Sequence, residues 1–465
     1  MKEQERNESY IHPTVLRVLR MLGLALAVLA VYVTAKVALT FCLGLFADGI
    51  HVAQLPGIGN PIVSLEHQQE KKHSLDPSEI AEVSRVSFAV AGDMMFHMPI
   101  VRTAWTGDGY DFSDVYGYLA PYTATADFAS ATLETTLAGY DRGYSGDPWF
   151  NSPDEILPYI RSAGFDLLLT ATEHAFDMEV SGLQRTISTV RANGLATLGT
   201  AESADQPRYQ IQTVGGIPIG MASYTFAETG DDGSVTVNGL TADSVAAGHL
   251  NVFDPNYLSR FYMEVEGILS ALRAGGVETS ILYLHWGDEY NTNASDTQRS
   301  MAQKLCDLGV DVIIGSHPHV VQPVDLLTAS TDPEHKTLVI YSAGTLVSNL
   351  RADTTDVVSG HTEDGLIFRF TLSKYNDGSV HLSSAGLLPT WTAVYGEGES
   401  RDFRVLPLDA AVADWASAYG LTEDQLSDAK ASYNRTMAIV TGGLNKITHY
   451  LGEQNAALNP DLGVG

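Results

Sequence analysis

Two histidines separated by one residue are the most specific chemical signal in the sequence. His317 and His319 flank Pro318 and follow residues 311–316, an apolar run that is typical of a buried strand. Pro318 stiffens the turn, and two imidazole groups held together at a strand end favour metal binding over a purely structural role. We therefore expect His317 and His319 to be metal ligands.

Three further apolar runs end in residues with ligand groups. The runs 86–92, 128–133 and 280–284 lead directly to Asp93, Glu134 and His285. Singly, such an acid is more often a helix cap, and such a histidine is as often a hydrogen-bonded core residue as a ligand. Their joint presence favours one site, because open α/β sheets gather functional groups at the carboxyl ends of their strands.

The chemistry that such a set supports is metal-assisted hydrolysis. Mixed carboxylate and imidazole ligands suit Mn, Fe or Zn, and this set is large enough for two divalent ions. Two adjacent ions lower the pKa of a shared water and stabilise a tetrahedral transition state, which suits phosphoester or related hydrolysis. His174 would then donate a proton to the leaving group, and Asp177, one helical turn further on, would orient its ring.

The elements that must position these residues alternate along the chain. Short apolar runs alternate with amphipathic helical stretches, a pattern that predicts an α/β domain, here over residues 83–398. Residues 399–465 carry two helical patterns, at 410–419 and 422–451, and no cluster of ligand groups. We expect this last part to be a helical extension that packs on the domain.

The N-terminal region predicts a membrane anchor. Residues 21–47 are apolar apart from Lys36 and are long enough to cross a bilayer as a helix. Basic residues precede them, so residues 1–20 are expected in the cytoplasm and the main domain outside the cell. The long run lacks a small-residue cleavage pattern, which favours an uncleaved signal-anchor over a signal peptide. The broken, polar residues 48–82 then predict a stalk.

The charge balance excludes one class of partner. The chain has 27 Lys and Arg against 56 Asp and Glu, for a formal net charge of -29. Binding to nucleic acid through its backbone is therefore unfavourable. An anionic polymer would also be repelled unless bound metal cations compensated locally. The two cysteines, Cys42 and Cys306, offer no disulfide framework.

Seven motifs occur in one order along the chain: Gly92–Met95, Leu133–Thr135, Phe150–Pro153, His174–Asp177, His285–Tyr290, Gly315–Gln322 and Tyr341–Gly344. This order, which spans about residues 83–395, resembles the CapA family of poly-gamma-glutamate capsule synthesis proteins. The resemblance implies a calcineurin-like metallophosphatase sandwich of two mixed sheets flanked by helices. It also implies a role outside the membrane in making, exporting or anchoring polyglutamate or a related anionic capsule polymer, with polyglutamate synthase subunits as partners.

The resemblance also assigns roles to individual residues. His174 matches the histidine of a family motif, and Glu173 stands where the family usually has asparagine. The Glu173 carboxylate would bind a cation more tightly than a neutral amide and would change water activation. Thr132 and Thr345 replace family asparagines as well. The metal set that the resemblance implies is Asp93, Glu134, His285, His317 and His319, with Glu173 joining it.

Two functions from different classes stay open on the sequence. The first is a membrane-anchored, metal-dependent hydrolase or transferase that acts on a capsule or cell-envelope polymer, and it predicts bound metal. The second is a non-catalytic, membrane-anchored assembly subunit of a capsule synthesis and export complex, and it predicts indifference to metal loss. A secreted phosphoesterase for small nucleotides is less favoured, because the anchor and the motifs point to the cell envelope.

Overall fold

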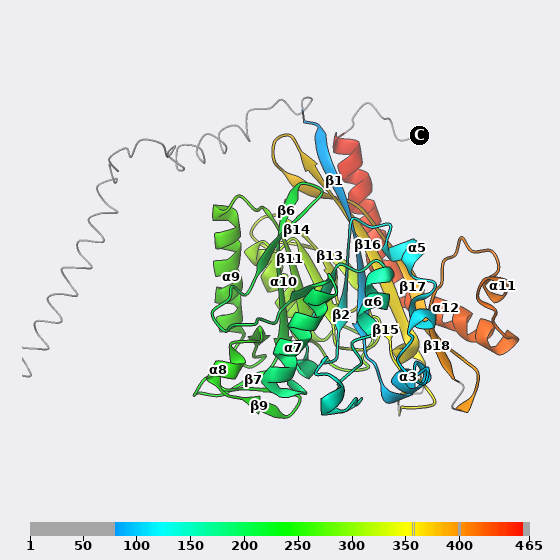
Figure 1. The fold of residues 1–465 in the computed structure, drawn as a ribbon. Coiled ribbons are helices and arrows are strands. Elements are labelled where there is room, and N and C mark those ends of the chain that lie inside the picture. The colour runs from blue at the N-terminus through cyan, green and yellow to red at the C-terminus, as the bar shows by residue number, and fades with distance from the viewer. Residues whose placement is uncertain (1–79, 356, 358, 399–400, 459–465) are drawn as a thin grey trace, which may run out of the picture. The chain divides into compact units, whose positions relative to one another are not determined.

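The described part of the protein is an α/β structure that begins near the predicted end of the stalk. The computed structural model describes residues 80–355, 357, 359–398 and 401–458. They form two large sheets, of eight and seven strands, and one small three-stranded sheet (Figure 1). The predicted cytoplasmic tail, the predicted transmembrane helix and residues 48–79 of the predicted stalk lie outside these residues. Among the described residues, no helix has the length and apolar character needed to span a bilayer.

The first sheet has eight strands in the order β18-β17-β16-β1-β2-β3-β4, with β15 paired to the end of β1. Strands β1 to β4 run parallel, whereas β16, β17 and β18 are antiparallel to their neighbours. The bounds are β1 (Glu82–Met94), β2 (Phe128–Leu133), β3 (Leu167–Leu169), β4 (Ala196–Leu198), β15 (Thr345–Val347), β16 (Asp364–Tyr375), β17 (Val380–Tyr395) and β18 (Asp402–Pro407).

The second sheet has seven strands in the order β10-β6-β11-β12-β14-β13, with β5 paired to β6. Its central strands are parallel and buried along their length, as expected for strands covered on both faces. The bounds are β5 (Gln210–Val214), β6 (Ile217–Phe226), β10 (Val252–Phe253), β11 (Thr279–His285), β12 (Val312–Ser316), β13 (Val324–Thr328) and β14 (Lys336–Ile340). The small sheet contains β7 (Glu228–Thr229), β8 (Val235–Val237) and β9 (Leu240–Ala242).

The two large sheets pack face to face, and helices cover their outer faces. One apolar cluster joins the inner faces, with Phe88 and Val90 from the first sheet and Ile281 and Ile314 from the second. Separate clusters lie under the helices on each outer side. The helices of this part of the chain are α3 (Met98–Thr103), α4 (Ser113–Tyr116), α5 (Ala120–Thr123), α6 (Ile156–Ser162), α7 (Glu179–Ala192), α8 (Ser244–Ala247), α9 (Leu258–Ala274) and α10 (Asp296–Leu308), with 3-10 turns η2 (Tyr140–Arg142), η3 (Glu173–Phe176) and η4 (His361–Glu363). The prediction of an α/β fold with two mixed sheets flanked by helices is confirmed.

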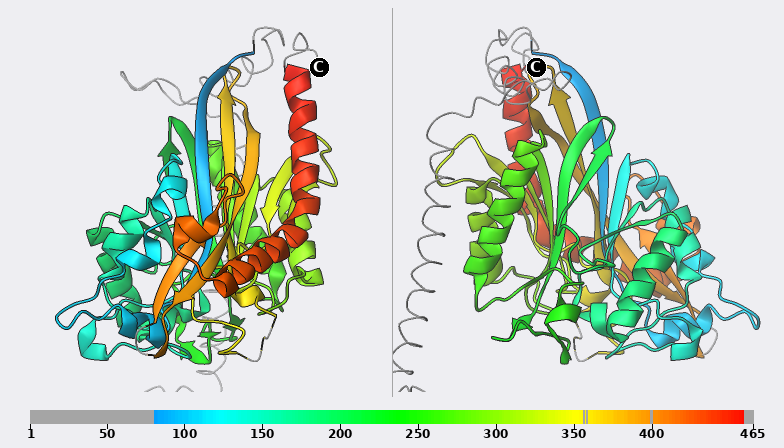
Figure 2. Two further views of the ribbon diagram at one scale, coloured as in Figure 1. Left: turned by 90° about the vertical axis from the view of Figure 1, so that its right-hand side faces the viewer. Right: turned by 60° about the vertical axis from the view of Figure 1, so that its left-hand side comes forward.

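The C-terminal part contains a strand that the predicted helical extension did not include. Strand β18 pairs with β17 and forms the edge of the first sheet. Helices α11 (Trp415–Tyr419) and α12 (Glu423–Leu458) follow, and α12 packs against β13, β16 and β17 (Figure 2). Val440 and Ile447 of α12 belong to the cluster between the sheets. The helix predicted at 422–451 corresponds to α12, whereas only residues 415–419 of the helix predicted at 410–419 are helical. Strand β18, which is only six residues long, was not predicted.

Two glycines permit the close approach of backbones near the strand ends. A Cβ at Gly92 would lie 1.9 Å from the Gly344 carbonyl oxygen, and one at Gly315 would lie 1.9 Å from the Tyr341 carbonyl oxygen. Any larger residue would therefore separate adjoining chain segments one residue before Asp93 and two residues before His317. The glycines in these two motifs serve packing, and this packing brings the next residues to one place.

Candidate metal centre

Three buried acids come from the first sheet. Asp93 is the second-last residue of β1, Glu134 directly follows β2, and Glu173 begins η3 after β3. Asp93 and Glu134 have no exposed surface, and Glu173 is 6% exposed. Because the three strands are parallel, their carboxyl ends lie at one edge of the sheet, where the sequence predicts these acids to meet.

Three buried histidines come from the second sheet. His285 is the last residue of β11, and His317 and His319 follow the neighbouring strand β12. His317 and His319 have φ angles of 95° and 55°, a left-handed backbone that non-glycine residues rarely adopt. The backbone N–H of His317 donates a hydrogen bond to Asp93 Oδ2 at 3.2 Å, which fixes the turn against the first sheet.

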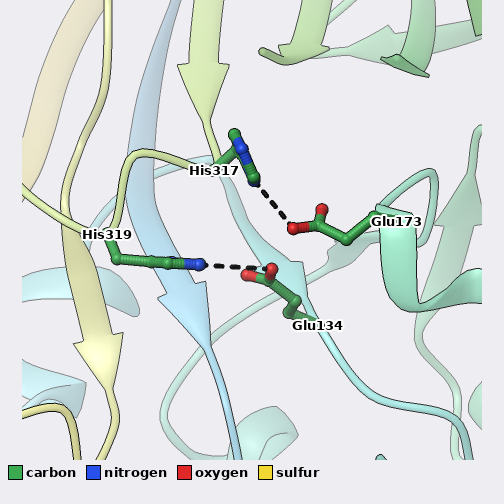
Figure 3. Close-up of side chains that lie close together, drawn as sticks. All are labelled: Glu134, Glu173, His317 and His319. Carbon is green, nitrogen blue, oxygen red and sulfur yellow. Dashed lines mark ion pairs between the residues drawn. The ribbon is translucent and has the colours of Figure 1, made fainter. Parts of the chain in front are cut away.

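All six predicted ligands meet between the two sheets. One group of ligand atoms comes from Glu134, Glu173, His317 and His319 (Figure 3), and a second comes from Asp93, Glu134 and His285. Within each group the ligand atoms lie within 4.8 Å of one another. Glu134 belongs to both groups, so a single carboxylate lies between two sets of ligand atoms. A buried cluster of this composition could hold metal.

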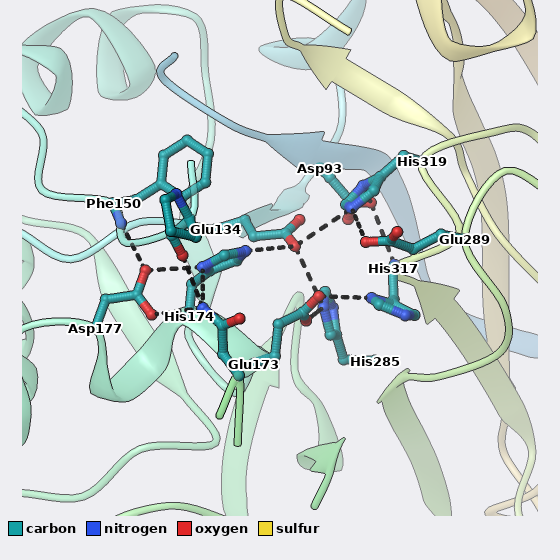
Figure 4. A network of polar contacts seen from close by, with 12 residues as sticks. Asp93, Glu134, Phe150, Glu173, His174, Asp177, His285, Glu289, His317 and His319 are labelled. Carbon is teal, nitrogen blue, oxygen red and sulfur yellow. Dashed lines mark hydrogen bonds and ion pairs between the residues drawn. The ribbon is translucent and has the colours of Figure 1, made fainter. Parts of the chain in front are cut away.

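The contacts within the cluster divide it into two sides, as Figure 4 shows. Glu173 contacts His285 Nε2 through one oxygen and lies 2.8 Å from His317 Nδ1 through the other. On the other side, His319 Nδ1 lies 3.2 Å from Asp93 Oδ2. Glu134 Oε1 lies 3.5 Å from His285 Nε2 and 3.7 Å from His319 Nε2. Glu134 therefore bridges the two sides.

The residues fit a metal because their oxygen atoms are left unsatisfied. Asp93 Oδ1 and both carboxylate oxygens of Glu134 are buried and accept no hydrogen bond within the described residues. Burying a carboxylate without a partner is costly, so native structures rarely do so without an ion or another compensating group. Oxygen and imidazole nitrogen are also the donors that Mn, Fe and Zn prefer. A divalent cation would satisfy all three oxygens.

Without a cation, protonated histidines would balance the acids. Burial raises the pKa of Glu173, but the charges of His285 and His317 outweigh this effect and hold the pKa well below its usual value. Burial lowers the pKa of His319, but Glu134 and Asp93 outweigh it and raise the pKa to about 9. The same balance against Glu173 and Glu134 raises the pKa of His285 well above its usual value. A metal would therefore displace protons from these rings as it bound.

The predicted proton donor lies beside the cluster. His174 Nδ1 donates a hydrogen bond to Asp177 Oδ2 at 2.7 Å, and His174 Nε2 faces Glu134 Oε1 at 4.0 Å. Burial lowers the pKa of His174, but the hydrogen bond to Asp177 and the nearby carboxylates outweigh it and raise the pKa. The protonated ring is thus favoured, with Asp177 on one nitrogen and the cluster facing the other. This is the arrangement predicted for His174 and Asp177.

One backbone N–H and one side-chain amide hold Asp177, and neither contact was predicted from the sequence. The Phe150 N–H donates to Asp177 Oδ2 at 2.6 Å, and Asn238 Nδ2 donates to Asp177 Oδ1 at 3.1 Å. Asn238 also donates to the Pro148 carbonyl at 2.8 Å. It lies in the turn between β8 and β9, with a φ of 47°. No strand-end pattern marks Asn238; an Asn-Gly turn between two short apolar segments is its one local signal.

Further residues that the sequence reading missed surround the histidines. Ser316 Oγ lies 2.8 Å from His285 Nδ1 and fixes the orientation of that ring. Phe226, the last residue of β6, packs its ring 4.8 Å from the centre of His317. His97 is a further histidine close to the site, and burial lowers its pKa to about 4, so it is neutral. These residues shape the surroundings of the cluster without joining it.

Comparisons with known proteins match the region that carries the site. The family model described as "Bacterial capsule synthesis protein PGA_cap" matches residues 87–350, which is more than half of the chain. The chain is 23% identical over 283 residues to "Capsule biosynthesis protein CapA" of Bacillus anthracis, covering 60% of this chain and 63% of the relative. It is 23% identical over 274 residues to "PGA biosynthesis protein CapA" of Bacillus subtilis (strain 168), covering 58% and 64%. The chain thus spans less than two thirds of the length of these curated relatives.

Proposed function

Because the chain belongs to the bacterial capsule synthesis protein family PGA_cap, we propose that it is a metal-dependent hydrolase or transferase of the metallophosphatase type acting on a capsule polymer. The observation that carries the proposal is the buried cluster with three unsatisfied carboxylate oxygens, next to a histidine that donates to a buried carboxylate. The two relatives are named for capsule or PGA biosynthesis, which favours poly-gamma-glutamate or a related envelope polymer as substrate.

The six residues of the cluster would hold the metal. Their ligand atoms form two groups that share Glu134: one adds Glu173, His317 and His319, and the other adds Asp93 and His285. Two divalent ions, of Mn, Fe or Zn, suit this division. When bound, such ions would polarise the oxygen atoms of a phosphoester group and activate water near neutral pH.

The chain's own residues would supply the proton and the dry environment. His174 would pass the proton on Nε2 to the leaving group, while Asp177 keeps the other ring nitrogen protonated and the ring in place. Phe226 and Phe150 pack on the site histidines and keep water away from them. The low local dielectric strengthens each electrostatic contact in the site.

The test compares metal content and hydrolysis in matched variants of the full chain. After dialysis against Mn²⁺, Fe²⁺ or Zn²⁺, elemental analysis should find metal in the wild type and a clear loss in His317→Ala. His249→Ala is the control, because His249 is also buried but bonds only a backbone carbonyl, that of Ala201. With bis(p-nitrophenyl) phosphate as substrate, His174→Ala should lose about 100-fold in rate while keeping its metal. Equal metal in His317→Ala and the wild type would refute the proposed site.

The second candidate function is a non-catalytic assembly subunit, and Glu173 favours it. Glu173 replaces the neutral family residue and already pairs with His285 and His317 from within the protein. A site that compensates part of its own charge needs a cation less. Capsule polymer production in cells carrying His174→Ala separates the two functions, since an enzyme would lose production and an assembly subunit would keep it.

We also propose that residues 21–47 anchor the chain in the membrane, with residues 1–20 in the cytoplasm and the main domain outside the cell. The apolar run and the basic residues before it support this topology. Protease added to intact cells should then degrade the main domain, and carbonate washing of membranes should leave the chain in the pellet. Recovery of the intact chain in the cytoplasmic fraction would contradict the anchor.

A further inference from the structure

A row of aromatic rings lies on the surface near the metal centre. The ring centres of Trp105 and Tyr110 are 5.0 Å apart, those of Tyr110 and Tyr144 are 5.6 Å apart, and those of Tyr144 and Tyr140 are 5.9 Å apart. Trp105 is 50% exposed and Tyr140 is 77% exposed. Large aromatic side chains exposed together are uncommon on a soluble surface and mark binding sites. We call these four residues the aromatic row.

The segment that carries Tyr140 and Tyr144 is held in one conformation. Asn151 is buried, and its Nδ2 donates hydrogen bonds to the carbonyls of Gly139 at 3.1 Å and Gly143 at 2.7 Å. Ser145 exchanges backbone hydrogen bonds with Asn151. The rings of Tyr140 and Tyr144 are therefore placed before any ligand arrives, which lowers the entropic cost of binding.

The same segment forms a hydrogen bond with one of the proposed catalytic residues. It ends at Phe150, whose N–H holds Asp177, and the Pro148 carbonyl accepts a hydrogen bond from Asn238. Trp149, between these two anchor points, is 48% exposed. A ligand lying along the aromatic row would therefore continue toward His174. This continuity makes the row a candidate extension of the substrate site.

The charges around the row favour a neutral ligand over a polyanion. Arg142 pairs with Glu179, and Arg185 makes a bidentate pair with Asp154, so these two cations are already neutralised. Glu155 is exposed and lies close enough to Tyr110 and Tyr144 to act on both hydroxyls. Carboxylates beside aromatic rings repel an anionic chain but accept hydrogen bonds from neutral hydroxyl groups.

We propose that the aromatic row binds a neutral glycan segment, with sugar rings against the exposed faces of Trp105 and Tyr140 and sugar hydroxyls donating to nearby carboxylates. The apolar C–H face of a sugar ring packs on an aromatic face, and its hydroxyl rim needs polar partners, which this surface offers together. The role of the row in presenting substrate rests on the proposed function, and it requires a related envelope polymer with glycan segments, because poly-gamma-glutamate is itself a polyanion. The binding itself does not, because none of the four residues touches the metal cluster.

Isothermal titration of the full chain with chitohexaose, in buffer containing EDTA, tests the binding apart from any metal chemistry. The wild type should bind, and Trp105→Ala and Tyr140→Ala should each weaken binding about fivefold, with a larger loss in the double variant. Tyr257→Ala is the matched control, because Tyr257 is 65% exposed and lies outside the row. It should bind as the wild type does. Thermal unfolding of each variant checks that the fold is intact.

Three results would overturn the proposal. The first is no heat of binding to chitohexaose in the wild type, and the second is equal affinity in the double variant. The third is that poly-gamma-glutamate or phosphatidylglycerol vesicles bind in place of the glycan and lose affinity in the same variants, which would assign the row to a polyanion or a membrane. Because EDTA is present throughout, each result leaves the metal-dependent function untouched.

Discussion

Two regions of this molecule bury pairs of acids, and they treat them in opposite ways. Near the start of β16, Glu363 and Asp364 are buried beside two arginines. At the metal centre, Asp93 and Glu134 are buried with histidines that reach them only at 3.2 to 4.0 Å. The first region satisfies its acids from within the chain, and the second does not.

The arginine region is complete without any outside group. Arg435 donates to both oxygens of Asp364, at 2.7 and 2.8 Å. Trp391 Nε1 donates to Glu363 Oε2 at 3.0 Å, and Arg351 lies at the same distance from that oxygen. Every carboxylate oxygen of this pair therefore has a donor, the remaining Glu363 oxygen accepting from a backbone N–H. The contrast teaches that this fold can satisfy buried acids, so the unsatisfied oxygens of Asp93 and Glu134 are a feature of a binding site.

The largest expected effect on stability comes from removing the arginine that neutralises Asp364. Arg435→Ala leaves Asp364 buried without its cation, so we expect the free energy of unfolding to fall by about 3 to 5 kcal/mol. Urea unfolding followed by circular dichroism measures this. Arg85→Ala is the control, since Arg85 forms an exposed ion pair with Glu82 and should change stability by less than about 1 kcal/mol. A similar small change in both variants would show that the Asp364 pair is not needed.

A smaller effect on stability comes from adding metal to the cluster that contains Asp93 and Glu134. At a free metal concentration about 100 times its dissociation constant, binding should stabilise the folded chain by about 2.7 kcal/mol. Thermal unfolding with Mn²⁺ or Zn²⁺, against the same protein with EDTA, measures the shift. Glu134→Gln should abolish the shift, because Glu134 bridges both sides, whereas Arg435→Ala should keep it. A full shift in Glu134→Gln would show that metal binding does not depend on the buried Glu134 carboxylate.

The pH dependence of the free energy of unfolding should also differ between the metal-free and the metal-bound cluster. The pKa of His319 is about 9 in the folded chain, so its contribution to stability is complete below about pH 6.5 and is lost as the pH rises through 9. In EDTA, unfolding free energy should therefore fall over this window. With metal present the trend should weaken or reverse, because deprotonated histidines bind metal more tightly. Parallel curves with and without metal would contradict this linkage.

The smallest expected effect lies at the edge of the site. Asn238→Ala removes one hydrogen bond to Asp177 and one to the Pro148 carbonyl, at a cost of about 1 kcal/mol in stability. Metal content should not change, since Asn238 contacts His174 and Asp177 and none of the six predicted metal ligands. Differential scanning calorimetry with elemental analysis distinguishes these outcomes. Loss of metal in Asn238→Ala would mean that the small sheet supports the cluster itself.

The site residues that follow predicted strands could be identified from the sequence. Asp93, Glu134 and His285 each end a buried apolar run, and parallel strands bring such ends together by geometry alone. Glu173 needed the family resemblance, since in the structure it begins a short 3-10 turn four residues beyond the end of β3. The membrane anchor and the domain boundaries stay predictions.

The sequence was insufficient where position depends on packing between distant segments. Asn238 reaches Asp177 from a hairpin 61 residues away, and no local pattern fixes where that hairpin docks. Phe226 lies at the end of a long strand that reads only as core. Strand β18 is short, and it becomes a strand because the edge of β17 offers it hydrogen-bond partners. Such residues are set by tertiary contacts, which single-sequence patterns do not contain.

The left-handed backbone of His317 and His319 has a consequence for how this segment can change. A residue with a β-carbon stores strain of order 1 kcal/mol or more in that conformation, and glycine would relieve it. Substitutions that made the fold more stable here would remove the imidazole rings. The segment is therefore under two opposed demands, and a lineage that no longer needed the chemistry would be expected to drift toward glycine at these two positions first.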